Sequence, residues 1–289
     1  MNKNISSVII KNKYSKCLES NFLKFFESKM APIKVSDKYS PFQLRFCPTI
    51  VAKKAEVSVT HPNPKSSIKP SNPFLPFDQN LLLSYLNTDY ALIFNKYCVV
   101  PEHLLIITTN FVPQNSPFSP KDFEAVDQVL IGLKDVKPLA FYNSGPEAGA
   151  SQEHRHFQVI QTGGSPIENH IISIDKFDEP FLIPFYSSFK HGCLRKSLTA
   201  SNDWYYDAYQ RLLDYCGMPS VAYNLLWTED WMLIVPRRKE FADDGINSLN
   251  AMAFAGYFLV MNEDHLYSGF DVIKTLEEVT FANKTAASK

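Results

Sequence analysis

The chain has 289 residues, and its content of 45% hydrophobic and 20% charged residues is that of a globular protein rather than a disordered one. Its 29 basic and 30 acidic residues give a formal net charge of -1 without a basic stripe, which argues against a general nucleic-acid-binding protein. The five cysteines form no Cys-x-x-Cys pair and no apolar run approaches the roughly 20 residues of a membrane span, so we expect a soluble intracellular protein, cytoplasmic or also nuclear, with reduced thiols.

The first predicted elements are short. Residues 21–29 are expected to form a short helix. The five prolines of residues 60–76 predict an extended surface loop, whose tail at 72–77 returns to the core. Two strands then follow at 91–100 and 103–109, joined by a Pro-Glu pair.

A stronger helix signal comes next. Ser119 is a typical N-cap and Pro120 a typical first helical residue, and apolar residues then recur at helical spacing, which predicts a helix over about 120–135. A strand at 138–143 runs into a glycine-containing loop, and a further strand is expected at 155–161.

The second half of the sequence gives fewer clear signals of secondary structure. Residues 165–202 mix prolines with aromatic residues and give no clear pattern. Beyond them we predict a helix ended by glycine, a hairpin, a buried apolar segment and a terminal helix, at 204–216, 221–237, 249–260 and 271–279. The residues alone therefore indicate a mixed α and β protein.

Glycine is scarce in this chain and clustered. Average usage would give about 20 glycines in a chain of this length, whereas the chain has 10, four of them within one twenty-residue stretch: Gly145, Gly149, Gly163 and Gly164. The first two belong to a loop of small residues whose backbone N–H groups could approach an anion closely. The last two are expected to end the following strand.

Three polar residues share one face of that strand. Side chains alternate in a strand, so His154, His156 and Gln158 point one way and Arg155 and Phe157 the other. This pattern could be a hydrogen-bonded polar stripe. It could also supply two zinc ligands, but a site needs three or four and the other histidines have no ligand spacing. A neutral imidazole beside a phosphate-binding loop is, alternatively, a nucleophile toward phosphorus.

The segment NSGPEAGASQEHRHFQ, residues 143–158, resembles the active-site segment of the histidine-triad superfamily, in the branch that has His-x-His-x-Gln. That branch includes galactose-1-phosphate uridylyltransferase and the diadenosine tetraphosphate phosphorylases. Similarity to the latter continues, in family order, at 48–53, 94–103, 223–237 and 250–256. The chain is thereby identified as a member of the diadenosine tetraphosphate phosphorylase (ATP adenylyltransferase) family.

The resemblance implies a fold and a set of site residues. The fold is α+β, a histidine-triad-like antiparallel sheet with flanking helices, in two related halves, 1–165 and 166–289, that form one compact unit. His156 is the nucleophile, Gln158 contacts the phosphate and His154 orients the site. The substrate-binding residues are Lys53, Asn95, Lys96, Asn143, Gly149, Ala150, Ser151, Gln152, Gln158, Asn250, Ala251 and Met252.

Some of these residues could also have purely structural roles. A single lysine such as Lys53 or Lys96 is by default a surface residue, and Asn95 is also a typical turn residue. At Met261 the sequence departs from the family, which has a substrate-contacting lysine there.

The implied activity is phosphorolysis of diadenosine tetraphosphate by inorganic phosphate, giving ATP and ADP reversibly through an adenylyl-histidine. A divalent cation, Mg²⁺, is expected to accompany the polyphosphate, with no protein metal site and no organic cofactor. The expected partners are the nucleotide and phosphate, with no nucleic acid or membrane, and the oligomeric state is open. The alternatives are a related hexose-nucleotide phosphorylase or uridylyltransferase, and a non-catalytic nucleotide-binding protein.

Overall fold

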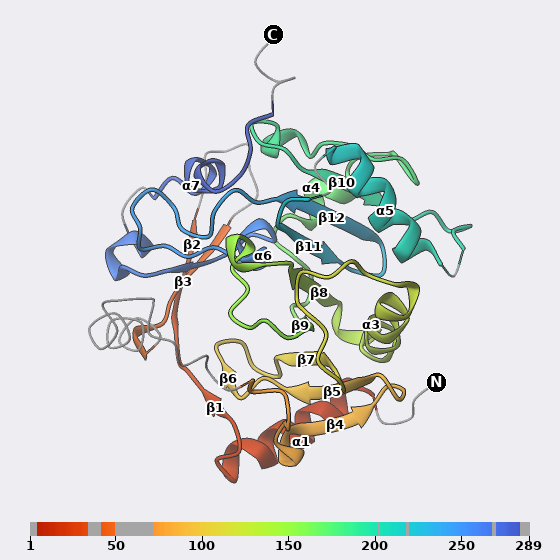
Figure 1. The fold of residues 1–289 in the computed structure, drawn as a ribbon. Helices are drawn as coiled ribbons and strands as arrows, with labels where there is room; N and C mark the ends of the chain where they lie inside the picture. Colours follow the sequence, from red (N-terminus) through yellow and green to blue (C-terminus); the bar gives the residue numbers. More distant parts are fainter. Residues whose placement is uncertain are drawn as a thin grey trace.

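The computed structural model describes residues 5–33, 42–49, 72–201, 203–217, 220–267 and 270–283. Its centre is an eight-stranded sheet in the order β10-β12-β11-β8-β9-β7-β5-β4 (Figure 1), in which all neighbours are antiparallel. The strands are β4 (Leu82–Tyr85), β5 (Tyr90–Phe94), β7 (Leu104–Thr108), β8 (Pro138–Asn143), β9 (His156–Gln161), β10 (Gly192–Arg195), β11 (Tyr223–Trp227) and β12 (Trp231–Pro236).

Two smaller groups of strands accompany the large sheet. In one, β3 lies between an antiparallel and a parallel neighbour, and in the other two short strands pair in parallel. Their members are β2 (Lys29–Ile33), β3 (Phe42–Phe46) and β13 (Tyr257–Val260), and β1 (Lys24–Phe25) with β6 (Tyr97–Cys98).

The α-helices are α1 (Ser7–Glu19), α3 (Pro120–Gly132), α4 (Glu168–Ile172), α5 (Trp204–Cys216), α6 (Ala251–Phe254) and α7 (Val272–Glu278). Single 3₁₀ turns cover Gln79–Leu81, Lys134–Val136, Pro146–Ala148, Pro184–Tyr186 and Glu263–Leu266. Within the described ranges, no helix is long and apolar enough to cross a membrane.

The large sheet separates two hydrophobic cores. Because side chains alternate along a strand, neighbouring core residues of β8 to β12 enter different cores, whereas both faces of β5 and β7 pack in the first core. Tyr142 and Phe157 pack into the first core with residues of α1, α3 and α5, whereas Phe141 and Ile160 pack into the second. The second core also takes in residues of β3, β13, α4, α6 and α7. Figure 1 shows α3 and α5 on one side of the sheet, and α6, α7 and the small sheet on the other.

The elements with strong local signals form as predicted. The helix α3 begins with a capping box in which Ser119 and Asp122 bond reciprocally. The helix α5 ends at Gly217 in a left-handed conformation, with φ of 60°. The hairpin of β11 and β12 and the helix α7, capped by Asp271, also agree with the sequence. The expected α+β class is confirmed.

The prediction of a helix at residues 21–29 is wrong. The helix lies upstream as α1, where the side chain of Ser6 accepts a hydrogen bond from the N–H of Ile9. The chain then turns at Asn21, whose φ is 57°, and continues as β1 and β2. The strand β1 pairs with β6, which is distant in sequence, so no local pattern could reveal it. The strand β2 pairs with β3, the next strand along the chain.

Two other predicted segments are divided in the structure. The strand expected at 91–100 stops at Phe94, because the side chain of Asn95 accepts the N–H of Tyr97 and turns the chain. The buried segment at 249–260 is split into α6 and β13 by Gly256, whose φ is 95° and where a Cβ would lie 2.7 Å from Pro166.

The proline-rich segment is described only at its end. Most of the loop predicted at 60–76 lies outside the described residues. Its tail does pack on the core as predicted, since Phe74 is only 7% exposed. Residues 165–202, whose sequence shows no clear pattern, contain α4 and the edge strand β10.

The two halves predicted from the sequence share the large sheet. The strands β10, β11 and β12 come from residues 166–289, and the other five come from residues 1–165. The join is the antiparallel pairing of β11 with β8, where Asn224 lies opposite Asn143. The sheet is therefore continuous across the predicted boundary.

Candidate active site

The strand β9 carries His156 and Gln158 on the face that packs toward the second core. In the register of β7 with β9, Ile107 lies opposite His156 and Leu105 opposite Gln158. His156 and Gln158 therefore share the sheet face that also carries Phe141. Phe157 enters the first core, as the predicted alternation requires.

The ring of His156 is held in one protonation state. Its Nδ1 lies 2.8 Å from the carbonyl oxygen of His154, and a carbonyl can only accept, so Nδ1 carries the proton. The lone pair is then on Nε2. Burial lowers the pKa of His156 to about 4, so the imidazole is neutral near neutral pH. A neutral ring with a free Nε2 lone pair is the form that a nucleophilic histidine requires.

His154 is engaged through both ring nitrogens. Its Nε2 donates to the carbonyl oxygen of Thr108 at 2.9 Å, and its Nδ1 accepts from Nδ2 of Asn72 at 2.9 Å. The rings of Phe74 and Phe111 meet it edge-on, at centroid distances of 5.6 and 5.7 Å. His154 thus has no free lone pair for a phosphorus atom or a metal, and its carbonyl sets the tautomer of His156.

Gln114 is a contact of His156 that the sequence did not indicate. Its Oε1 accepts the backbone N–H of His156 at 2.9 Å, and its Nε2 donates to the carbonyl of Asn143 at 2.8 Å. The side chain is 4% exposed. It stands in an irregular loop without a recognisable motif, and only the fold brings this loop to the start of β9.

A buried ion pair fixes the same loop from the other face of the sheet. The guanidinium of Arg155 lies 3.0 Å from Asp122 of α3 and also donates to the carbonyls of Ser116 and Pro117, at 2.6 and 2.9 Å. The hydroxyl of Tyr90 donates to Asp122 at 2.9 Å. The catalytic strand, α3 and the Gln114 loop are therefore tied together beside the site.

The predicted phosphate loop is tightly wound. The N–H groups of Gly149 and Ala150 donate within the loop, to Pro146 and Gly145, at 2.9 and 3.0 Å. Those of Ser151 and Gln152 have no recorded partner among the described residues. The N–H groups that remain available to bind an anion are therefore those of Ser151 and Gln152, which follow Gly149 in the loop.

Gly149 is required by its surroundings. Its φ is 80°, and a Cβ there would lie 2.6 Å from the carbonyl oxygen of Leu249. This contact brings the segment before α6 against the loop. Asn250 caps α6 through its own side chain, and the N–H of Ala251 donates to Oδ1 of Asn143 at 3.0 Å.

The structure thus gathers most of the predicted substrate-binding residues. Asn143 also accepts a hydrogen bond from Nδ2 of Asn224 at 2.8 Å, and Asn224 bonds the carbonyl of Ala148 in the loop at 2.8 Å. Residues of both halves therefore meet at the loop: Asn143, Gly149, Asn250 and Ala251, with Met252 next in α6.

Arg237 binds residues at this junction, and the sequence did not assign it a role. Its guanidinium, 1% exposed, donates to Oδ1 of Asn224 at 2.5 Å and to the carbonyl of Leu249 at 3.0 Å. Its other recorded acceptors are backbone carbonyls as well. Burial lowers the pKa of Arg237 to about 9, which leaves it charged at neutral pH behind the loop.

The remaining predicted residues are placed differently. Lys53 lies outside the described residues. Lys96 is on the surface, 3.9 Å from Asp78, and Asn95 bonds within the protein, to Tyr97 and His103. Neither has a recorded contact with His156. No group of three or more metal-binding side chains occurs among the described residues.

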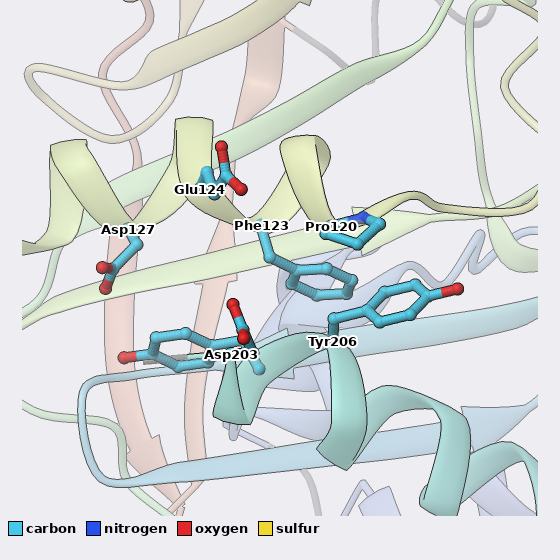
Figure 2. Close-up of a pocket in the computed structure, with 7 residues that line it drawn as sticks. Pro120, Phe123, Glu124, Asp127, Asp203 and Tyr206 are labelled. Atoms are coloured by element: carbon cyan, nitrogen blue, oxygen red, sulfur yellow. The ribbon is translucent and has the colours of Figure 1, made fainter. Parts of the chain in front are cut away.

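A hollow between α3 and α5 is a poor place for a polyphosphate (Figure 2). Figure 2 shows the carboxylates of Glu124, Asp127 and Asp203 around it, and no lysine or arginine lines it. It opens on the side of the first core, across the sheet from His156. Like charges would repel an anion there.

Comparisons with known proteins agree with this geometry. Residues 3–175 match the family model of the Ap4A phosphorylase N-terminal domain, and residues 183–282 match that of the ATP adenylyltransferase C-terminal domain. The chain belongs to the Ap4A phosphorylase family. The resemblance found in the sequence is thereby confirmed.

Individual members of the family align over nearly the whole chain. Diadenosine 5',5'''-P1,P4-tetraphosphate phosphorylase 2 of Saccharomyces cerevisiae is 25% identical, with 89% of this chain and 87% of that protein covered. Protein APA1 of the same yeast is 24% identical over the same shares. The crystal structure of yeast Ap4A phosphorylase Apa2 in complex with AMP superposes with a TM-score of 0.79 at 25% identity, covering 97% of each chain.

Proposed function

We propose that this protein phosphorolyses diadenosine tetraphosphate with inorganic phosphate, giving ATP and ADP. The observation that carries the proposal is His156, a neutral ring whose Nε2 has no recorded partner among the described residues and which shares a strand face with Gln158. The yeast relative named as a diadenosine tetraphosphate phosphorylase and the family models support the same reaction.

In the proposed first step, Nε2 of His156 attacks an α-phosphorus of the dinucleotide. The bond from that phosphorus to its bridging oxygen breaks, and ATP leaves with the bonding electrons. The ring, now bonded at Nε2 and protonated at Nδ1, is cationic, and the carbonyl of His154 stabilises that charge through its 2.8 Å hydrogen bond.

In the second step, an oxygen of inorganic phosphate attacks the adenylyl phosphorus. The N–P bond breaks, ADP is released, and the lone pair returns to Nε2. Two displacements avoid the need to hold two mutually repelling polyanions in one transition state. Each step is the reverse of a similar displacement, so ATP and ADP can re-form the dinucleotide.

Gln158 accounts for the choice of acceptor in this scheme. An amide cannot act as a general acid at neutral pH, but it can donate hydrogen bonds to a phosphoryl oxygen at any pH. Phosphate is already ionised and needs no base to attack, whereas water does. We expect Mg²⁺ to arrive with the polyphosphate and to neutralise part of its charge.

The test follows radiolabelled dinucleotide with and without inorganic phosphate. We expect equal amounts of ATP and ADP only when phosphate is present, and a labelled adenylyl-protein in its absence. His156→Ala should lose both signals, whereas His191→Gln, which changes a buried histidine outside the site, should retain them. Hydrolysis at the same rate without phosphate, or full activity of His156→Ala, would contradict the proposal. Turnover of UDP-glucose instead would indicate a uridylyltransferase.

A further inference from the structure

His103 places a buried ring nitrogen beside β9, the strand of His156 and Gln158. His103 lies just before β7, and its Nε2 is buried without a well-aligned partner among the described residues. Buried polar atoms in proteins are nearly always paired, so an unpaired one at a binding site calls for an explanation. The same ring packs against Phe141 on the His156 face of the sheet, at a centroid distance of 5.9 Å.

The position of the proton on His103 follows from its neighbours. The backbone N–H of Tyr97 donates to Oδ1 of Asn95 at 3.1 Å, which fixes the orientation of that amide. The amide nitrogen of Asn95 then faces Nδ1 of His103 at 3.2 Å. Because an amide nitrogen can only donate, Nδ1 accepts and the proton of the neutral ring is on Nε2.

The strand register points this N–H toward Gln158. Leu105 lies directly opposite Gln158, so His103, two residues earlier, is its diagonal neighbour on the same face. The side chain of Gln158 acts on the ring of His103 as a hydrogen-bond partner, and that of His156 acts on it electrostatically. Burial lowers the pKa of His103 to about 4, so the ring remains a single donor at Nε2 near neutral pH.

We propose that His103 is a positioning residue for Gln158. Its Nε2–H donates to Oε1 of Gln158 and so turns the amide NH₂ toward the phosphoryl group at His156. Without this donor, the amide could present either its oxygen or its nitrogen to the substrate, and the oxygen would repel a phosphoryl oxygen. Asn95, His103 and Gln158 thus form a relay of fixed polarity across three adjacent strands. The role of the amide toward the phosphoryl group rests on the proposed function, whereas the relay itself does not.

The relay can be tested without turnover. ¹⁵N NMR of the histidine rings in the full chain reports the tautomer of His103. We expect the Nε2–H form, with an Nε2 shift that changes in Gln158→Ala. An Nδ1–H form, or an Nε2 shift that ignores the Gln158 substitution, would overturn the proposal.

Its effect on catalysis is tested by a double-mutant cycle. His103→Asn removes the donor from the Nε2 position, whereas the longer amide of His103→Gln keeps one there. We expect His103→Asn to lower kcat by about tenfold with KM for the dinucleotide within about twofold, and His103→Gln to recover most of the loss. In the Gln158→Ala background, His103→Asn should have no further effect. An equal loss in both backgrounds would mean that His103 supports the fold rather than Gln158.

His191→Asn is the matched control for this cycle. His191 is also a buried neutral histidine of the second-core face, but its Nε2 accepts the N–H of Ile183 and its Nδ1 bonds the carbonyl of Phe189. Its substitution should lower stability and show no coupling to Gln158. If the wild-type protein made no ATP and ADP from the dinucleotide, the proposed function would fail, while the NMR experiment would still decide on the relay.

Discussion

At the scale of single residues, the two histidines of the motif have opposite tautomers, and backbone carbonyls set both. His154 is protonated on Nε2 and donates a hydrogen bond to the carbonyl of Thr108, whereas His156 is protonated on Nδ1 and donates to the carbonyl of His154. Both residues are recognisable in the sequence. Their different functions are decided by which carbonyl each ring meets, and Thr108 is distant in sequence.

The protonation of His156 makes a prediction about the pH dependence of its chemistry. A neutral ring is active, and its pKa of about 4 keeps it neutral down to acid pH in the free protein. We expect the second-order rate constant for the burst of ATP release from the dinucleotide, measured without phosphate, to change by no more than about twofold between pH 7 and about pH 5. An ordinary histidine pKa near 6.5 would give roughly a tenfold or larger fall over that range, which would contradict the assignment.

At the scale of elements, the phosphate loop is shaped by its contact with the segment before α6. Gly149 has no room for a side chain because the carbonyl of Leu249 occupies the position, and that carbonyl is itself held by Arg237. Gly163 belongs to the same glycine cluster and also has a positive φ, of 67°, but a Cβ there would meet nothing within 4 Å. Gly149 is therefore packed against another segment, whereas Gly163 serves only the turn.

Substitution of these two glycines should separate strain from packing. In Gly163→Ala the only unfavourable effect is the left-handed backbone conformation, so we expect the unfolding free energy to fall by about 1 kcal/mol and the activity to remain normal. Gly149→Ala adds a clash with a backbone atom, so we expect a loss of about 2–4 kcal/mol and a fall in kcat/KM of at least about tenfold. Urea unfolding and phosphorolysis rates measure the two effects. Equal behaviour of the two variants would show that the loop can move away from Leu249.

At the scale of the whole molecule, one sheet carries both halves of the chain and separates the two cores. The site lies where β8 of the first half pairs with β11 of the second. The same burial that builds this face keeps three histidines neutral: His103, His156 and His191, each with a pKa of about 4.

These histidines predict how stability depends on pH. Their folded pKa values lie below the unfolded value of about 6.5, so between about pH 6.5 and 4 the unfolded chain binds more protons than the folded one. Stability should therefore be complete above about pH 6.5 and fall as the pH drops toward 4, by roughly 3 kcal/mol for each histidine. Urea midpoints measured across this range should fall less steeply in His191→Gln. An unchanged slope in that variant would contradict the neutral, buried state of His191.

How far the fold could be predicted depended on how local each element is. The helices α3, α5 and α7 carry their own caps, and the hairpin of β11 and β12 pairs neighbours in sequence. The edge strand β10 and the strand β1 depend on distant partners, and the sequence did not locate them. A local pattern can specify a cap or a turn, but it cannot specify which distant backbone will accept a strand's hydrogen bonds.

The sequence by itself determined the family and the residues of the candidate site: two histidines, a glutamine two residues after the second, and a loop of small residues before them. Only the tertiary structure decided the state in which these groups meet. It brought the side chain of Gln114 to the backbone N–H of His156, and His103 to a position beside Gln158. It also brought the charged guanidinium of Arg237 to Asn224, next to the loop. Tautomers, pKa values and amide orientations depend on partners in space and on exclusion of water, and both arise only when strands and loops from distant parts of the chain pack together.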